Sequence, residues 1–320
     1  MKKFTHAWIA FKAIERLKTA ELKPADRKYA DFLINWFENH KDGVIRGAWY
    51  PDTVIVDNGI SHIMKYVLQN EPSFTPFGSL PKTSLLFKNG KASALIQRGL
   101  SIDKKYNLPE RCEALSHAVI DNFKIQQCEE KGSSLTPTDN HIALLIFMLS
   151  HYIADAHMPL HCDNRPGTLD HFNLHDAIEQ VWEVEVVRFY AVDRPNQRFL
   201  YNPAGFPLLK EEPSYADSIL KSVEDELMQQ KFQVGYGTGN KNVLEYMHTV
   251  CRYSCLLSYT YLPQGFTQDQ LDQQTLQLMD HAGLPFREMS RISLSDAVDA
   301  VARIWLHDVR RYIKWKREIK

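Results

Sequence analysis

The sequence predicts an all-α protein, because hydrophobic residues recur with a helical period along most of the chain and strand patterns are scarce. The clearest case is residues 4–17, where large apolar side chains follow one another at intervals of three and four, as on an amphipathic helix. Further helices are expected over about 25–38, 109–128, 140–156, 170–190, 214–232, 241–261, 267–281 and 294–317. The strongest strand candidate is the short run 54–56, so we expect a multi-helix bundle.

Capping and helix-breaking residues predict where several of these helices end. Pro24 suits the first turn of the second helix, and Thr138 or Asp139 could cap the helix that begins near residue 140. Glycine, proline and asparagine punctuate residues 43–59, which predicts a loop or a short irregular stretch. Residues 191–213 are rich in proline and polar residues, and they are also expected to be irregular.

The composition is that of an ordinary globular protein. Among 320 residues, 44% are hydrophobic and 24% are charged, and the formal net charge is −1. The absence of a basic excess removes the simplest argument for nucleic acid or an anionic membrane as a partner, without excluding either. No apolar run of about 18 residues occurs, so no transmembrane segment is expected. No signal peptide is seen, which predicts a cytoplasmic chain as written, or a secreted one if the chain is a processed form.

The cysteines do not indicate a disulfide framework. There are five of them, an odd number, and their spacing is irregular. Cys251 and Cys255 lie four apart on a predicted helix, a spacing that can hold a metal. Two small buried core thiols are the favoured interpretation of this pair.

Two histidine–carboxylate pairs carry the strongest chemical signal in the chain. His151 and Asp155 lie four apart on one predicted helix, so their side chains share a face, and His161 follows shortly after. His175 and Glu179 repeat the four-residue spacing on the next predicted helix. Imidazole nitrogen and carboxylate oxygen together suit Zn²⁺. The alternative is that each pair is only a surface ion pair, and this becomes harder to sustain when two pairs fall on adjacent helices in an apolar context.

Three residues farther upstream become candidate metal ligands only when they are considered together with these pairs. His6 lies at the start of the first helix, Asp52 follows a proline, and His62 comes ten residues later. An aspartate after proline is usually a turn residue, and a lone histidine is usually a polar filler. His157 and His171 lie near the pairs and are expected to support ligands by hydrogen bonds or to be exposed.

Together these segments resemble the zinc-dependent phospholipase C superfamily, which also contains the fungal single-strand nucleases. Residues 5–14 look like the family's first ligand-bearing helix, and residues 150–161 look like its signature, the most specific match. Residues 47–52 and 61–62 resemble the loop that supplies an Asp and a His. The last carboxylate, Glu179, is of the bacterial phospholipase C type, whereas the nucleases have Asp at that place.

The resemblance implies an all-α bundle with a cluster of two to three zinc ions at the base of a cleft. The ligands of the first zinc would be Asp52, His62, His151 and Asp155. Those of the second would be His161, His175 and Glu179. Those of the third would be His6, Asp155 and Met1, the last through the N-terminal amine and carbonyl of the chain. Asp155 would therefore bridge two metals. The family has a Trp in the place of Met1, so this ligand depends on a free amine at Met1.

The resemblance also implies a single domain over residues 1–320. Compared with the family, the chain has an expected insertion near 70–135 and a helical C-terminal extension from about residue 214. The insertion is expected either to cover the site or to build a different substrate pocket.

The predicted activity is metal-dependent hydrolysis of a phosphodiester by a metal-activated water, with Asp52 as the general base. The first choice of substrate is a phospholipid, cleaved in the manner of a phospholipase C, with transient contact with a membrane surface. One alternative is a single-strand nuclease or nucleotidase of the same superfamily, and nucleic acid is a partner only in that case. A second alternative is a non-catalytic, zinc-stabilised helical protein, although structural zinc sites are usually closed and rich in cysteine.

Overall fold

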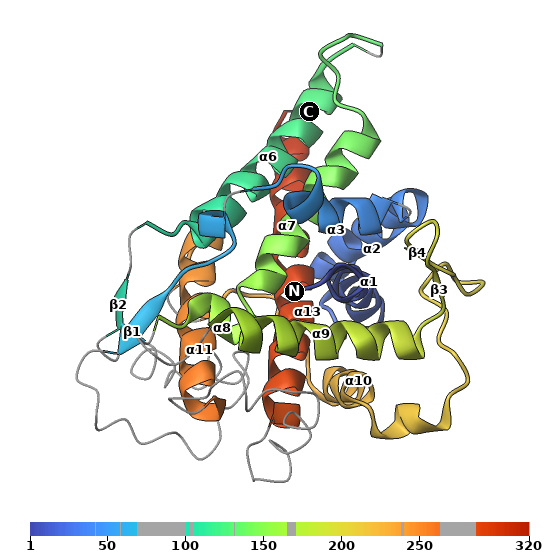
Figure 1. Cartoon of the computed structure of the whole chain (residues 1–320). Helices are drawn as coiled ribbons and strands as arrows, with labels where there is room; N and C mark the ends of the chain where they lie inside the picture. The colour runs from blue at the N-terminus through green and yellow to red at the C-terminus, as the bar shows by residue number, and fades with distance from the viewer. Residues whose placement is uncertain are drawn as a thin grey trace.

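Helices make up most of the protein in the computed structural model, which confirms the all-α prediction (Figure 1). The structure describes residues 1–41, 43–57, 59–68, 100–102, 105–130, 132–164, 171–237, 240–262 and 286–319. The α-helices are α1 (Lys3–Thr19), α2 (Pro24–His40), α3 (Gly43–Thr53), α6 (Leu108–Cys128), α7 (Asp139–Asp155), α8 (Pro159–Cys162), α9 (His171–Phe189), α10 (Ile219–Gln229), α11 (Val243–Tyr261) and α13 (Phe286–Glu318). Two 3-10 turns are η1 (Gly59–Ser61) and η2 (Pro213–Asp217).

Short antiparallel strand pairs are the only sheets among the described residues. Strand β1 (Tyr66–Leu68) pairs with β2 (Leu100–Ile102), and Tyr66 lies opposite Ile102. Strand β3 (Val192–Asp193) pairs with β4 (Arg198–Phe199). The second pair lies in the segment predicted to be irregular, and its two residues per strand are too few to show a period of two in the sequence.

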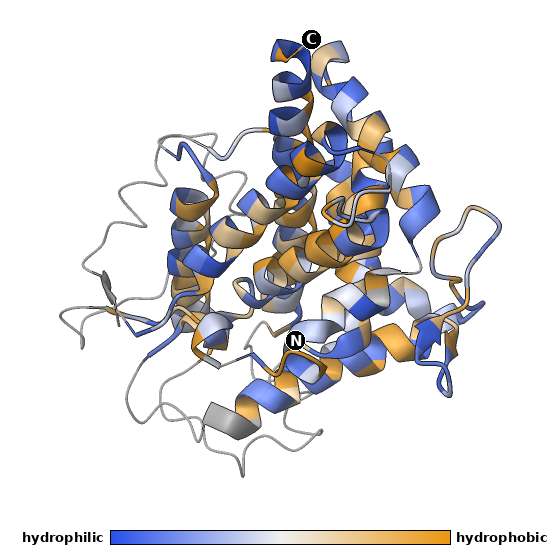
Figure 2. Cartoon of the chain, turned by 90° about the horizontal axis from the view of Figure 1, so that it is seen from above, coloured by the Kyte–Doolittle hydropathy of each residue, from blue (hydrophilic) through white to orange (hydrophobic). Residues whose placement is uncertain are grey.

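Helix α13 runs through the middle of the bundle. It packs against α1, α2, α6, α7, α10 and α11 (Figure 1). Its charged residues Asp296, Asp299, Arg303 and Asp308 are therefore buried with its apolar ones, and Arg16 Nε of α1 lies 2.8 Å from Asp299 Oδ1. Most other helices carry both polar and apolar residues, as expected where one side faces a core and the other faces solvent (Figure 2).

Helix α3 corrects the prediction of a loop over residues 43–59. Val44 and Ala48 are fully buried, and α3 packs against both α1 and α7. A Cβ atom on Gly47 would lie 2.4 Å from Phe147 Cβ, so the missing side chain is what allows α3 and α7 to approach closely. The glycine that suggested a loop is thus a helix-packing residue.

Of three other predictions about where elements lie or begin, one is confirmed and two differ from the structure. Residues 54–56 are a turn that follows α3 and not a strand. Thr138 caps α7, because its Oγ1 accepts a hydrogen bond from the backbone N–H of His141 at 3.2 Å. The last helix, α13, includes Phe286, eight residues earlier than the expected start at residue 294.

The domain division stays a prediction. Residues 69–99 of the expected insertion and the helix expected over 267–281 lie outside the described residues. All five cysteines are free, and Cys251 and Cys255 are buried on α11, which confirms that they are core thiols. Within the described residues, none of the helices has a stretch apolar enough and long enough to cross a bilayer.

Candidate metal centre

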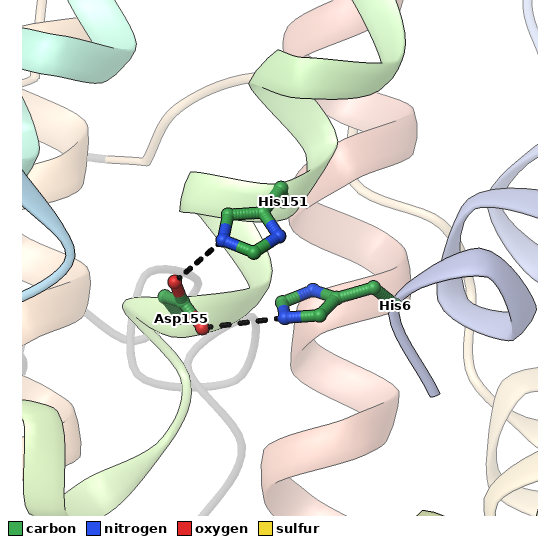
Figure 3. A group of neighbouring side chains, drawn as sticks. All are labelled: His6, His151 and Asp155. Carbon is green, nitrogen blue, oxygen red and sulfur yellow. Dashed lines mark ion pairs between the residues drawn. The ribbon is translucent and has the colours of Figure 1, made fainter. Parts of the chain in front are cut away.

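The C-terminal turn of α7 forms the centre of the candidate site. His151 and Asp155 are both buried on the same face of this helix, as their four-residue spacing predicts. His151 Nδ1 lies 2.8 Å from the Ala48 carbonyl oxygen of α3, so this ring nitrogen donates to the carbonyl. The other nitrogen, Nε2, then points at Asp155 Oδ2, 3.2 Å away (Figure 3).

Asp52 and His62 join this pair from α3 and from the residue after η1. His62 Nδ1 lies 2.9 Å from Asp155 Oδ2 and 3.2 Å from His151 Nε2. Asp52 Oδ1 lies 3.4 Å from His151 Nε2 and 3.8 Å from His62 Nδ1. Asp52 is the exposed member of this group, with 40% of its side chain accessible to solvent.

A second group contains His161 of α8 with His175 and Glu179 of α9. The Nε2 atoms of the two histidines lie 2.7 Å apart, and their rings are stacked. Glu179 Oε1 lies 3.0 Å from His175 Nε2 and 3.6 Å from His161 Nε2. Two ring nitrogens and a carboxylate oxygen thus face one another, an arrangement that a shared cation stabilises.

His6 and the N-terminal amine complete a third group around Asp155 Oδ1. His6 of α1 stacks on His151 with ring centroids 4.0 Å apart, and its Nε2 lies 3.5 Å from Asp155 Oδ1 (Figure 3). The α-amino nitrogen of Met1 lies 3.0 Å from Asp155 Oδ1 and 2.6 Å from Glu179 Oε1. The two oxygens of Asp155 therefore face different groups, as a bridging carboxylate would.

Buried positive charge offsets the carboxylates of this cluster. Burial alone lowers the pKa of the Met1 amine, but Asp155 and Glu179 outweigh it and raise that pKa to about 11. Burial likewise opposes charge on His151, yet Asp155 and Asp52 raise its pKa to about 10. Burial would raise the pKa of Asp155, but the ammonium group and His151 hold it well below its ordinary value. Without a metal, the protons on the Met1 amine and on His151 thus supply the positive charge that a bound cation would otherwise supply.

His6 and His161 are held neutral, the form in which an imidazole nitrogen can bind a metal. Burial lowers the pKa of His161 to about 3, although Asp155 acts in the opposite direction. Burial, followed by the charges on His151 and the N-terminal amine, holds the pKa of His6 well below its ordinary value. Neither ring nitrogen of His6, nor Nδ1 of His161, has a hydrogen-bond partner among the described residues. Unpaired buried nitrogens beside carboxylates fit a divalent cation bound by imidazole and carboxylate, and the donor set suits Zn²⁺.

The structure therefore brings together all nine residues that the resemblance implies as ligands. Within each of three sets, the ligand atoms lie within 4.8 Å of one another. The sets are His6, His151 and Asp155, then Asp52, His62 and His151, and then His161, His175 and Glu179. That these residues bind metal stays a prediction. His157 is buried at the end of α7, and its Nδ1 donates to the Ile153 carbonyl at 2.7 Å, so it lies outside the three sets. The side chain of His171 lies outside the described residues.

A cavity of about 730 Å³ opens over the cluster. Its walls include the Met1, Asp52, His62, His161, His175 and Glu179 groups together with Lys2, Lys3, Trp49, Asp57, Lys65 and Glu183. Asp52 and His175 keep 40% and 31% of their side chains exposed, so the cluster is accessible from this side. Substrate-sized molecules can therefore reach the candidate ligands.

Glu183 holds the start of α1 in place, and it was not among the site residues predicted from the sequence. Its carboxylate accepts hydrogen bonds from the backbone N–H groups of Phe4 and Thr5 at 3.1 and 2.9 Å, and from Thr5 Oγ1 at 2.9 Å. It thereby ties the beginning of α1, and with it Met1 and His6, to α9. The four-residue interval between Glu179 and Glu183 was the available signal, because it places both carboxylates on one face.

Comparisons with known proteins add little to this geometry. No protein-family model matches the chain, and no curated protein matches it. Among solved structures, the chain is similar to the alpha toxin from Clostridium absonum, at 14% identity and a TM-score of 0.46, over 97% of this chain and 65% of the toxin chain. The chain thus spans less than two thirds of the toxin's length. A likeness of this degree carries no argument about function, which has to be argued from the site itself.

Proposed function

We propose that this protein is a zinc-dependent hydrolase of phosphodiesters, and that its substrate is a phospholipid cleaved in the manner of a phospholipase C. One observation carries the proposal: the two oxygens of the buried Asp155 face separate groups of imidazole and amine nitrogens at the base of an open cavity. Structural zinc sites are usually closed and rich in cysteine. This site has no cysteine among its three ligand sets and is open at Asp52 and His175, which favours catalysis over a purely structural role.

The residues of the chain divide the work of such a reaction. Zn²⁺ bound here would supply Lewis-acid polarisation of the phosphate and acidify a nucleophilic water. The Ala48 carbonyl fixes the orientation of His151, so that Nε2 always faces the cluster. Asp52 lies at the exposed edge of the ligands, where its carboxylate can take the proton of the attacking water as general base.

The phospholipid assignment rests on Glu179 as the last carboxylate and on the resemblance of the first helix, and transient contact with a membrane surface belongs to it. The single-strand nuclease and the non-catalytic zinc protein are the competing outcomes. The test is metal analysis of untagged protein followed by assays on bis-p-nitrophenyl phosphate, phosphatidylcholine and single-stranded DNA, each with and without chelator. We expect about two to three zinc ions per chain and chelator-sensitive lipid turnover.

Two variants separate the roles of the residues. Asp52→Asn is expected to lower kcat on bis-p-nitrophenyl phosphate by about 100-fold or more, because the proton acceptor is lost and one of the four candidate ligands of the first zinc is weakened. His151→Ala is expected to lose both zinc and activity, because a buried ligand is removed. DNA turnover without lipid turnover would move the assignment to the nuclease alternative, bound zinc without turnover would support the structural role, and a metal-free protein would contradict all three.

A further inference from the structure

A second cavity continues from the metal centre along α9. It has a volume of about 610 Å³ and shares Lys3, Trp49 and Glu183 with the cavity over the cluster. Its far side is lined by Arg188 of α9 and by Arg194 and Lys210 of the segment that follows this helix. A molecule bound at the cluster can therefore extend into this second cavity past shared walls.

Helix α9 sets the length of this path. Glu179 belongs to the second candidate ligand group, Glu183 lies one turn farther, and Arg188 lies nine residues beyond Glu179. At 1.5 Å per residue, the path from the ligand group to the arginine is about 13 Å. The far side of the second cavity is thus about 13 Å from the second ligand group, and none of the candidate ligands lines this cavity.

Cationic side chains outnumber carboxylates along the walls of the second cavity. Lys3, Arg188, Arg194 and Lys210 line it, against one carboxylate, that of Glu183. The Glu183 carboxylate is already engaged by the backbone N–H groups at the start of α1, whose partial positive charge offsets it. The net field in the cavity therefore favours an anion.

The cations at the far side are partly held in place and partly free. Lys210 Nζ donates to the carbonyl oxygens of Val187 and Arg188 at 2.9 Å each, at the C-terminal end of α9. Arg188 Nη2 donates to Ser214 Oγ at 2.8 Å and lies 3.4 Å from Glu212 Oε1, which offsets part of its charge. The guanidinium of Arg194 has no hydrogen bond or ion pair among the described residues, although it lines the cavity. Arg194 is therefore the side chain most available to a ligand.

We propose that this second cavity binds a second anionic group of the substrate, a phosphate, while the scissile phosphodiester lies at the cluster. The proposal rests on the proposed function and narrows its substrate class to phosphodiesters that carry a further phosphate. Within this second cavity a quaternary ammonium group is disfavoured, because Lys3 Nζ already lies 3.5 Å from the centre of the Trp49 ring. Phosphatidylcholine is therefore expected to be a slower substrate than a phospholipid whose headgroup carries a further phosphate.

The test uses small p-nitrophenyl phosphodiesters whose second arm is an alkyl chain ending in hydroxyl, trimethylammonium or phosphate. With the zinc-loaded protein, kcat/KM is expected to be about tenfold higher for the phosphate-ended diester than for the hydroxyl-ended one, at a chain that spans about 13 Å. The trimethylammonium-ended diester is expected to be no better than the hydroxyl-ended one.

Arg194→Gln is expected to reduce the preference for phosphate over hydroxyl to about threefold, and the double variant with Lys210→Gln to reduce it to about one. The matched control is Arg317→Gln, an exposed arginine in the last turn of α13 that lies outside both cavities. This control should keep the full preference, and thermal melting should show that all variants are folded.

Equal turnover of the hydroxyl- and phosphate-ended diesters would overturn the second site and leave the proposed function intact. A preference that survives in the double variant would also overturn it. If no diester is hydrolysed, the proposed function fails, and calorimetric binding of the same compounds decides the second site: tighter binding of the phosphate-ended compound, lost in Arg194→Gln, supports it, and equal binding contradicts it.

Discussion

At the scale of single residues, His6 is the most informative side chain in the protein. It is buried, and both of its ring nitrogens lack hydrogen-bond partners among the described residues. Leaving a buried polar group unpaired costs about 1–3 kcal/mol. A cation between His6 and Asp155 would offset this cost, so His6 should contribute to metal binding more than to the stability of the metal-free chain.

The histidine at position 6 can be tested against a second buried histidine. His6→Ala is expected to lower the zinc content by about one ion per chain, because the third ligand group loses its imidazole. His157→Ala is the matched control, since His157 is equally buried but donates to the Ile153 carbonyl outside the ligand sets. Zinc content measured by atomic absorption should fall only in the first variant. An equal loss in both would show that His6 acts through packing.

Asp308 on α13 is a buried carboxyl group far from any candidate ligand in the sequence. Burial raises its pKa to about 8, although Ser116 Oγ donates to its Oδ1 at 2.6 Å. The folded state therefore binds a proton that the unfolded state has released between pH 3.8 and about 8. The contribution of this group to stability is largest below pH 3.8, falls as the pH rises, and is lost above about pH 8.

Asp308→Asn should remove this pH dependence. We expect the free energy of unfolding of the wild-type protein to fall more between pH 5 and pH 8.5 than that of the variant, because the amide cannot ionise. Urea unfolding at the two pH values measures the difference. Asp121→Asn, at an exposed aspartate of α6, is the control and should follow the wild type. If the free energy of unfolding falls equally with pH in Asp308→Asn and in the wild type, Asp308 is not the group responsible for this pH dependence.

At the scale of elements, the contact between α3 and α7 holds the first ligand group together. Helix α3 supplies Asp52 and the carbonyl of Ala48, while α7 supplies His151 and Asp155. The distance between α3 and α7 is set by Gly47, which faces Phe147 of α7. The geometry of the ligand group thus depends on a residue that contacts no ligand.

Gly47→Ala should push these two helices apart. The new Cβ would meet Phe147 Cβ at 2.4 Å, and we expect a loss of about 1–3 kcal/mol in stability together with weaker zinc binding. Gly43→Ala on the same helix is the control, because its Cβ would lie 3.4 Å from the Phe147 ring, an ordinary contact. Gly43 is the first residue of α3, where the higher helix propensity of alanine adds little, so the control should be close to neutral. The melting temperatures of both variants can be measured by calorimetry, and that of Gly47→Ala is expected to be the lower. Equal melting temperatures would contradict the role of Gly47 in the contact between α3 and α7.

At the scale of the whole molecule, the candidate ligands connect distant parts of the chain. They come from α1, α3, the residue after η1, α7, α8 and α9. Metal bound there would cross-link these elements in the folded state only, and it would therefore stabilise the protein.

Removing the metal is expected to destabilise the entire fold. With free zinc about 1000-fold above its Kd, the stabilisation would be about 4 kcal/mol. We expect a chelator to lower the melting temperature by roughly 6 °C, and added Zn²⁺ to restore it, as measured by differential scanning calorimetry. Mg²⁺ at the same concentration is the control and should not restore it, because it prefers oxygen ligands. A melting temperature unaffected by chelator would argue against a metal centre.

The helical class and the two histidine–carboxylate pairs on α7 and α9, each with its members four residues apart, could be predicted from local patterns in the sequence. These features depend on backbone hydrogen bonds and side-chain spacing within a few residues, so a local pattern is enough to predict them. The residues far from the signature, His6, Asp52 and His62, were identified only by resemblance to a family. Spacing along the chain says nothing about their distance from Asp155.

Three features became visible only in the folded protein: α3 is a helix, α13 runs through the core, and a cavity lined by cationic side chains adjoins the cluster. Gly47 looks like a loop residue until Phe147 is placed against it, and the charges of α13 look exposed until six helices surround them. The cavity combines Lys3, from the start of α1, with Arg188, Arg194 and Lys210, which lie about 200 residues later in the sequence. These side chains line one cavity only because α9 packs beside the start of α1. Such contacts arise from the packing of segments that are distant in sequence, and no periodicity within a segment encodes them.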